Sequence, residues 1–179
     1  NVRAIPGAVF AYWSSLNILS VFEKYESLST LLTPRQGVKT LDNNRFLKLW
    51  FEVEFEKIGF GVQSLEEANS LHRKWFPYNK GGAAIKWYGN KDYIVNWEND
   101  GAEMKDFAVQ KYNSVTRTIT NISNFFLSGI TWSDVSTGNI AVRYAEAGSI
   151  FDSTGIMAFG NEDQLQYIIG LMNSKVMML

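Results

Sequence analysis

Apolar side chains recur at helical spacing in four segments of the chain, with polar side chains between them. The helices predicted from this pattern cover residues 16–27, 64–75, 102–113 and 161–175. Residues that suit a helix cap precede three of them, namely Ser14 or Ser15, Ser64 and Asn161. Glu67 can complete a capping box with Ser64. The last helix has the clearest buried stripe, formed by Leu165, Ile168, Ile169 and Met172.

Aromatic and β-branched residues dominate the segments between these helices, which favours strands. A short strand is predicted within residues 28–40. A longer one is predicted over residues 43–55, with alternating acids that point outward at Glu52, Glu54 and Glu56. Residues 83–89 and 92–98 flank the turn sequence GNKD and are predicted to form a β-hairpin. Further short strands are predicted within residues 116–122, 129–135, 139–145, 149–153 and 155–159.

The order of these elements predicts an α+β fold. Short, regularly spaced strands indicate a twisted, mostly antiparallel or mixed sheet with flanking helices and a C-terminal helix. The chain has 179 residues and neither an internal repeat nor a long linker, so we expect one domain over residues 1–179. It starts without Met and stops within the apolar sequence NSKVMML, so we expect it to be a fragment of a larger protein.

The composition excludes several classes of chemistry. The absence of cysteine rules out disulfides, thiol catalysis and thiolate metal sites, and is compatible with a cytoplasmic location. His72 is the only histidine, so no multi-histidine metal site can form. The formal net charge is -1, so nucleic-acid binding would need a local basic patch. No apolar run approaches the roughly 20 residues of a membrane span, so we expect no membrane association.

The sequence contains no recognisable catalytic motif. It lacks a nucleophile elbow, an HExxH helix, a Walker-type loop and a GxGxxG loop that opens a helix. Acids such as Glu98, Asp100, Asp134 and Asp152 are scattered, and turn or capping roles account for them. We therefore assign no catalytic residue and no metal ligand, and expect the chain to be inactive by itself.

Three segments combine basic and amide side chains with turn-rich backbone. Residues 34–48 hold four basic side chains against the single acid Asp42. Residues 73–91 hold five basic side chains, five aromatic ones and no acid around a Gly-Gly turn. Residues 111–118 add Lys111 and Arg117. Because lysine and arginine neutralise phosphates, and arginine, glutamine and asparagine match base edges, these segments are candidate DNA contacts.

The candidate DNA-binding residues are Arg35, Gln36, Asn43, Asn44, Arg45, Lys80, Gly81, Gly82, Lys86 and Arg117. We expect Lys80, Lys86 and Arg117 to contact phosphates, and the residues from 35 to 45 to contact base edges or phosphates. The two glycines would permit a close backbone approach and, with the two lysines, would form an exposed tip. Trp75, Trp87, Trp97, Trp132 and Tyr88 are interpreted mainly as structural supports. A protein-interaction module, an aromatic carbohydrate-binding surface and an unspecified globular domain remain alternatives.

Five successive blocks carry a resemblance to a known family, and they include the sequences PYNKGG, KWYGN and VNWENDG. They lie at residues 5–13, 34–53, 74–101, 128–155 and 165–176. These blocks resemble the C-terminal part of PglX-type DNA adenine methyltransferases of BREX phage-resistance systems, which have a TaqI-like specificity domain. The resemblance implies a target-recognition domain. At position 41 it leads us to expect a small residue such as glycine, where this chain has Leu41.

The resemblance also implies what lies outside this chain. The family's methyltransferase domain binds S-adenosylmethionine and carries an Asn-Pro-Pro-Tyr motif, which is absent here. We therefore expect a catalytic domain N-terminal to residue 1, double-stranded DNA as a partner, and other phage-defence proteins as further partners. The alternatives that the resemblance leaves open are a protein-interaction module of the defence complex and the specificity domain of a fused restriction nuclease and methyltransferase.

Overall fold

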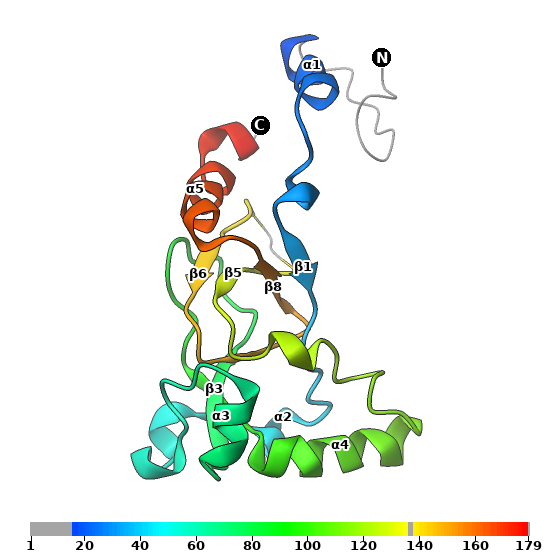
Figure 1. Cartoon of the computed structure of the whole chain (residues 1–179), viewed down its shortest axis with the longest axis vertical. Coiled ribbons are helices and arrows are strands. Elements are labelled where there is room, and N and C mark those ends of the chain that lie inside the picture. Colours follow the sequence, from blue (N-terminus) through cyan, green and yellow to red (C-terminus); the bar gives the residue numbers. More distant parts are fainter. Residues whose placement is uncertain (1–15, 136–137, 179) are drawn as a thin grey trace. The chain divides into compact units, whose positions relative to one another are not determined.

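The computed structural model describes residues 16–135 and 138–178 (Figure 1). The chain divides into two compact units, residues 1–33 and 34–179. In the first unit, α1 (Leu16–Lys24) confirms the predicted helix but ends three residues earlier. The short 3-10 helix η2 (Leu28–Thr30) follows, and its cap Ser27 accepts a hydrogen bond from the backbone NH of Ser29. The proposed caps at positions 14 and 15 lie outside the described residues.

Two four-stranded sheets form the framework of residues 34–179. One sheet has the order β1 (Thr33–Arg35), β8 (Gly155–Phe159), β5 (Gly129–Ser133) and β6 (Arg143–Ala145). The other has the order β2 (Leu47–Leu49), β4 (Tyr93–Asn96), β3 (Trp75–Asn79) and β7 (Ile150–Phe151). β4 is antiparallel to β2 and β3, and β5 is antiparallel to β6 and β8, whereas β7 is parallel to β3. The predicted α+β class is therefore confirmed.

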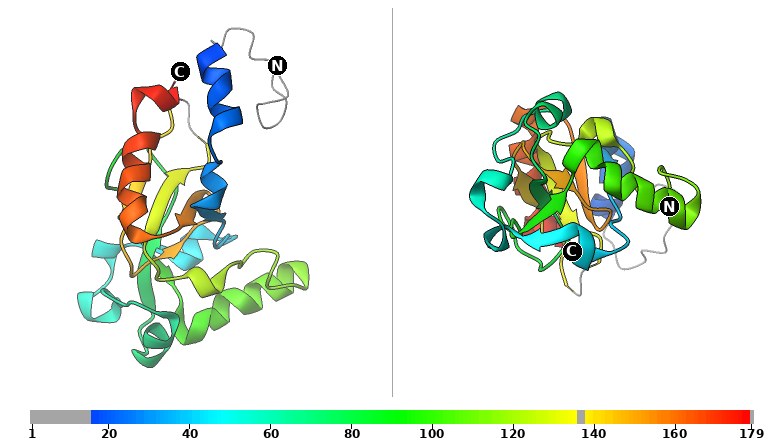
Figure 2. Two further views of the ribbon diagram at one scale, coloured as in Figure 1. Left: turned by 45° about the horizontal axis from the view of Figure 1, so that its top comes forward. Right: turned by 90° about the horizontal axis from the view of Figure 1, so that it is seen from below.

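The helices of this unit lie at both of its ends. They are α2 (Asn43–Phe46), α3 (Leu65–Ser70), α4 (Glu98–Tyr112) and α5 (Glu162–Met172), with 3-10 turns η3 (Trp50–Glu52), η4 (Phe55–Lys57), η5 (Ile122–Asn124) and η6 (Lys175–Met178). α5 packs against β5 and β6, while α3 packs against α4 at the other end (Figures 1 and 2). The predicted caps are confirmed, because Ser64 Oγ accepts from Glu67 NH at 3.1 Å and Asn161 Oδ1 accepts from Asp163 NH at 3.0 Å.

The strand predicted over residues 43–55 is wrong except at β2. Asp42 Oδ1 accepts a hydrogen bond from the Arg45 NH at 3.1 Å, which starts α2. The Glu52 carboxylate accepts from the Leu49 NH at 2.7 Å, which closes η3. Acidic side chains that bond nearby backbone NH groups stabilise turns in competition with strand pairing. The alternating acids therefore mark turns here rather than the outer face of a strand.

The hairpin predicted from residues 83–89 and 92–98 is also wrong. β4 pairs with β2 and β3 instead, so that Val95 lies between Leu47 and Phe76. The preceding loop runs along β6, where the Trp87 NH donates to the Val142 carbonyl at 3.0 Å. Burial of β4 between two strands removes more apolar surface from water than a solvent-exposed hairpin would. Residues 116–122 likewise form no strand and contribute one isolated bridge, at Ile119.

A chain of aromatic rings joins the two sheets. The Trp97 ring lies 5.2 Å from that of Phe125, which lies 5.5 Å from Phe151 in β7, which in turn lies 5.6 Å from Phe159 in β8. All three contacts have the edge-to-face arrangement that aromatic pairs favour. The structural role predicted for Trp97 and Trp75 is confirmed, because both side chains are buried.

Truncation of the central ring should strongly destabilise the fold. Phe125→Ala is expected to lower the free energy of unfolding by about 3–5 kcal/mol, because it leaves a cavity between two other rings. Phe51→Ala is the control, since that ring is 64% exposed, and it should change stability by less than about 0.5 kcal/mol. Urea denaturation followed by tryptophan fluorescence measures both. Equal effects of the two substitutions would contradict this description of the core.

Candidate nucleic-acid interface

Val38 lies where three segments of the chain meet. Its side chain is fully buried, and its backbone forms an antiparallel bridge with Ile119. The Val38 NH donates to the Phe151 carbonyl at 2.8 Å, and the Val38 carbonyl accepts from the Tyr78 hydroxyl at 3.1 Å. We call residues 35–39 and 117–121 together the Val38 junction.

Side chains and backbone hold the two halves of the Val38 junction side by side. The Lys39 NH donates to the Thr118 carbonyl at 2.7 Å. The Gln36 carbonyl accepts from the Thr120 hydroxyl and from the Asn121 amide, both at 2.8 Å. Two of the basic segments found in the sequence, far apart along the chain, are thus brought together.

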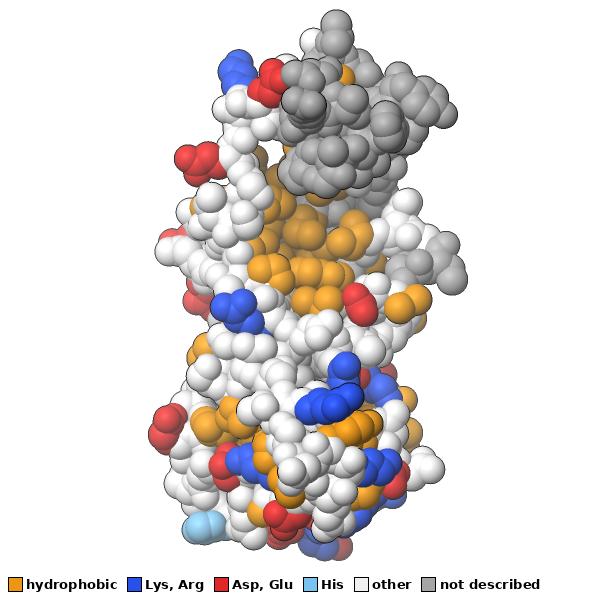
Figure 3. Space-filling model, turned by 90° about the vertical axis from the view of Figure 1, so that its right-hand side faces the viewer, with side chains coloured by type: hydrophobic (Ala, Val, Ile, Leu, Met, Phe, Trp, Pro, Cys, Tyr) orange, Lys and Arg blue, Asp and Glu red, His pale blue; other side chains and the backbone are white. Residues whose placement is uncertain are grey.

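Three exposed cations lie on the Val38 junction: Arg35, Lys39 and Arg117. None of them forms an ion pair with any residue that the structure describes. The Arg117 guanidinium lies 4.8 Å from the ring centre of Tyr112, a cation–π contact that orients it. Figure 3 shows basic side chains among apolar and acidic ones over the lower part of one face. Unpaired exposed cations are free to neutralise external anions.

The candidate DNA-binding residues on α2 follow the Val38 junction in the chain. They differ in whether their side chains already bind other residues of the protein. Asn43 accepts a hydrogen bond from the Thr40 hydroxyl, and Asn44 is exposed. Arg45 Nε lies 2.7 Å from Glu103 Oε1, and its guanidinium lies 5.0 Å from the Phe107 ring centre. Arg45 therefore already joins α2 to α4, whereas Asn44 is free to contact a ligand.

The loop predicted as an exposed tip at residues 80–86 is exposed at residues 82–85, whereas Lys80, Gly81 and Lys86 are half-buried against the protein itself. The Lys80 ammonium is half-buried and lies 4.6 Å from the Tyr93 ring centre. A Cβ at Gly81 would lie 2.6 Å from the Thr154 carbonyl oxygen, and the Gly82 NH donates to Ser133 Oγ at 3.0 Å. The glycines thus permit a close approach to the protein's own backbone.

Lys86 and its neighbours also differ from the prediction. The Lys86 ammonium donates to the Asn173 carbonyl at 3.0 Å, at the C-terminal end of α5, where a cation is electrostatically favourable. Trp87 and Tyr88, predicted as supports, are 56% and 55% exposed. Trp132 is half-buried. In the structure Lys86 therefore supports the fold, whereas the rings of Trp87 and Tyr88 are exposed.

The groups that hold the Val38 junction together could not be recognised from the sequence. A Cβ at Gly37 would overlap the Phe151 carbonyl oxygen, so only glycine fits without displacing the backbone. Burial, together with the nearby Asp152, raises the pKa of Tyr78 well above its usual range. The Tyr78 hydroxyl therefore keeps its proton and remains a donor to Val38 at neutral pH. The sequence shows Gly37 directly, but it does not show that Gly37 packs against Phe151, which lies 114 residues away in the chain.

Leu41 adopts the backbone conformation that the expected glycine would favour. Its φ of 63° is in the left-handed region, which costs a branched residue about 1 kcal/mol or more. Leu41 therefore stands, strained, at a position where the resemblance led us to expect a small residue.

The described residues contain neither a metal-binding cluster nor a helix that could span a membrane. No group of three or more His, Cys, Asp or Glu side chains gathers there to hold a metal ion. No helix among the described residues is long and apolar enough to span a bilayer.

The comparisons with known proteins point to one class of enzyme. No family model matches the chain. Two curated relatives show that it is similar to a segment of adenine-specific methyltransferases. They are PglX of Lacticaseibacillus casei (strain Zhang), 38% identical over 97% of this chain, and BrxX of Escherichia coli O9:H4 (strain HS), 38% identical over 98%. The chain spans 14% and 13% of their lengths, and the PglX resemblance drawn from the sequence blocks is confirmed.

A side chain at position 37 should disrupt the Val38 junction. Gly37→Ala is expected to lower the free energy of unfolding by at least about 2 kcal/mol, because its Cβ would collide with backbone rather than with a movable side chain. Gly170→Ala is the matched control. It lies within α5 with open space around its added Cβ, and it should leave stability unchanged or raise it by up to about 1 kcal/mol. Urea denaturation compares the two, and similar results for both would contradict the close contact.

Relief of the strained turn should stabilise the protein. Leu41→Gly is expected to leave the free energy of unfolding unchanged or to raise it by up to about 1 kcal/mol, because glycine adopts positive φ without strain. Leu41→Ile should lower it instead, since a β-branched residue is least tolerated there. Thermal unfolding of both variants measures this difference. A loss of more than about 1 kcal/mol in Leu41→Gly would show that packing of the leucine side chain outweighs the strain.

Proposed function

We propose that this segment recognises the DNA target of an adenine-specific, S-adenosylmethionine-dependent DNA methyltransferase of a phage-defence or restriction-modification system. The observation that carries the proposal is the Val38 junction, where Arg35, Lys39 and Arg117 meet as exposed cations without ion-pair partners in the described structure. The similarity to PglX and BrxX, which are named adenine-specific methyltransferases, supports DNA as the polyanion that these cations bind.

The proposed contacts divide by chemistry. Arg117 and Lys39 suit phosphates, which fix the register of a protein on the duplex. Arg35, Gln36 and Asn44 carry the donors and acceptors that suit base edges. The other sequence candidates, Asn43, Arg45, Lys80, Gly81, Gly82 and Lys86, rank lower because their polar groups or backbone already contact the protein.

Methyl transfer itself would take place in another part of the same protein. This sequence has three prolines and no Asn-Pro-Pro-Tyr motif, so none of its residues is assigned to S-adenosylmethionine or to the target adenine. In this proposal a methyltransferase domain N-terminal to residue 1 binds the cofactor. This chain, a target-recognition domain in the cytoplasm, positions the duplex, and the target base is extruded for reaction. A nuclease fused to the same parent is a variant of the proposal, which the parent's sequence would reveal.

A second candidate function is protein interaction, favoured by an aromatic patch away from the Val38 junction. Trp50, Phe51, Phe55 and Phe60 are 45%, 64%, 66% and 42% exposed, and the rings of Phe55 and Phe60 stack at 5.1 Å. Exposed aromatic clusters are typical of interaction surfaces. Such a patch would bind a partner protein of the defence complex without the steep salt dependence of DNA binding.

Salt dependence distinguishes the two candidates. Duplex affinity is measured by fluorescence anisotropy between 50 and 200 mM salt, spanning the range over which phosphate contacts weaken steeply. Lys39→Ala and Arg117→Ala should each reduce the slope of log affinity against log salt by about one, because each removes one phosphate contact.

Lys57→Ala is the control for that measurement, since Lys57 is exposed but pairs with Glu54 at 2.9 Å. It should leave the slope unchanged. If neither the chain nor the full-length protein shows salt-dependent duplex binding, the DNA assignment is wrong. If Phe51→Ser and Phe55→Ser abolish capture of a defence-complex partner while DNA binding is absent, the interaction module is favoured.

A further inference from the structure

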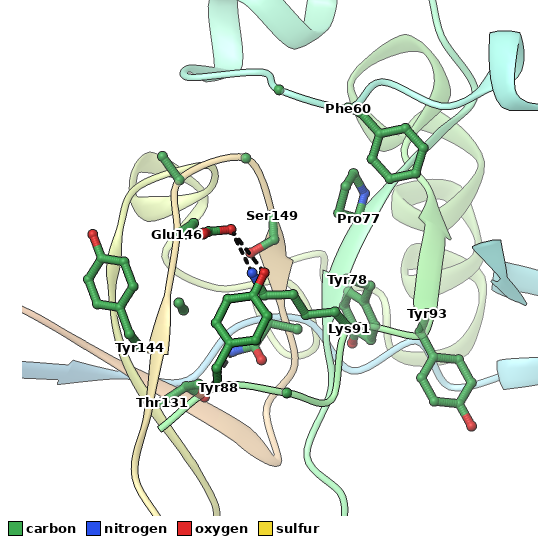
Figure 4. A pocket seen from close by; sticks show the side chains of 16 residues that line it. Phe60, Pro77, Tyr78, Tyr88, Lys91, Tyr93, Thr131, Tyr144, Glu146 and Ser149 are labelled. Carbon is green, nitrogen blue, oxygen red and sulfur yellow. Dashed lines mark hydrogen bonds and ion pairs between the residues drawn. The ribbon is translucent and has the colours of Figure 1, made fainter. Parts of the chain in front are cut away.

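A cavity of about 290 Å³ lies between β3 and β4 on one side and the segment 144–149 on the other (Figure 4). Five of its sixteen lining residues are aromatic, namely Phe60, Tyr78, Tyr88, Tyr93 and Tyr144. Ligand pockets in proteins typically range from about 300 to 1,000 Å³, so this cavity is of the size for one small planar group. None of its lining residues belongs to the Val38 junction.

The polar groups of the cavity converge on one carboxylate. Lys91 Nζ lies 2.7 Å from Glu146 Oε2, and the Tyr88 hydroxyl donates to the same oxygen at 3.4 Å (Figure 4). The hydrogen bond from Lys91 is the main cause that lowers the pKa of Glu146. The carboxylate is therefore ionised at neutral pH and acts as a hydrogen-bond acceptor.

The Lys91 ammonium and the Glu146 carboxylate therefore place hydrogen-bond donors and an acceptor next to each other. No described residue donates to Glu146 Oε1, and the Lys91 ammonium has three protons, of which one is directed to the carboxylate. The Lys91 ammonium lies 3.8 Å from the Tyr88 ring centre, which holds it beside the cavity. Phe60 and Pro77 lie across the cavity from Glu146 (Figure 4).

Tyr88 lines the cavity and is also 55% exposed to solvent. Exposed rings next to basic side chains are the stacking platforms on which proteins hold unpaired bases. The cavity wall also includes Gly61, Gly89 and Gly148, all with positive φ, so no side chain at these positions narrows it.

We propose that this cavity binds a single unstacked nucleobase. A nucleobase is a planar π system whose edge carries both donors and acceptors. Its face matches Tyr88, and its edge matches the adjacent Glu146 carboxylate and Lys91 ammonium. The base comes from an extrahelical nucleotide of the bound DNA, or from a free nucleotide of the same chemistry. The first source depends on the proposed DNA-binding function.

The cavity is physically connected to the Val38 junction through Tyr78. The Tyr78 side chain lines the cavity, while its hydroxyl bonds the Val38 carbonyl at 3.1 Å. Tyr78 therefore links the wall of the cavity to the backbone of the Val38 junction. This places an accessory base site beside the duplex-binding surface, separate from the absent catalytic domain.

The test uses the full-length protein and three duplexes of identical sequence: one fully paired, one with a single-nucleotide bulge, and one with an abasic residue at the bulge. The bulged duplex should bind at least about fivefold more tightly than the abasic one, because stacking of one base contributes a factor of this size or more. Tyr88→Ala and Glu146→Gln should abolish that preference. Glu98→Gln is the matched control, since Glu98 pairs with Lys74 at 3.6 Å on the surface outside the cavity.

Competition with free dAMP and dCMP identifies the source of the base. If these nucleotides bind with the same dependence on Tyr88 and Glu146 while the bulge confers no preference, the cavity is a free-nucleotide site. If neither a bulge nor a free nucleotide shows binding that depends on these two residues, the proposal is overturned. Affinity for the fully paired duplex and its salt slope report on the Val38 junction alone, so failure of the two proposals can be told apart.

Discussion

The close approach of Gly37 to the Phe151 carbonyl is the constraint on which the rest of the structure depends. It brings Val38 within hydrogen-bond distance of β7 on one side and of residues 118–119 on the other. A larger residue at position 37 would separate these segments, because the contact is with backbone that cannot move aside. The same contact buries Val38, positions its carbonyl for the Tyr78 hydroxyl and places Lys39 beside Thr118. One packing requirement therefore connects the sheet to the basic surface.

The cations of residues 80–91 differ in their contacts from those of the Val38 junction. Lys80 lies against the Tyr93 ring, Lys86 bonds the Asn173 carbonyl, and Lys91 pairs with Glu146. These contacts satisfy charges that the fold partly removes from water, and they fix the loop that precedes β4. Arg35 and Lys39 are exposed and form no ion pair with a described residue, and the exposed Arg117 contacts the Tyr112 ring, so these charges remain in contact with water. Density of positive charge along a sequence thus does not show which cations are free of contacts, because those contacts come from residues far apart in the chain.

The chain is similar to one part of much longer curated proteins. The chain spans about one seventh of the curated adenine-specific methyltransferases that it resembles, and no catalytic motif is visible in its sequence. An exposed basic surface, a cavity of about the size of a base and exposed aromatic rings are features that recognition and docking require. Catalysis requires a different set of groups, and the proposals assign that set to the remainder of the protein.

The sequence by itself determined the local elements and the kind of chemistry. Helix caps at Ser64 and Asn161 and the strand pattern of residues 155–159 depend on side chains within a few positions of each other. Only the tertiary structure decided which strand β4 pairs with, which of Lys86 and Trp87 is exposed, and that residues 35–39 meet residues 117–121. These outcomes depend on burial shared between residues far apart in the chain, and local spacing carries no record of such partners.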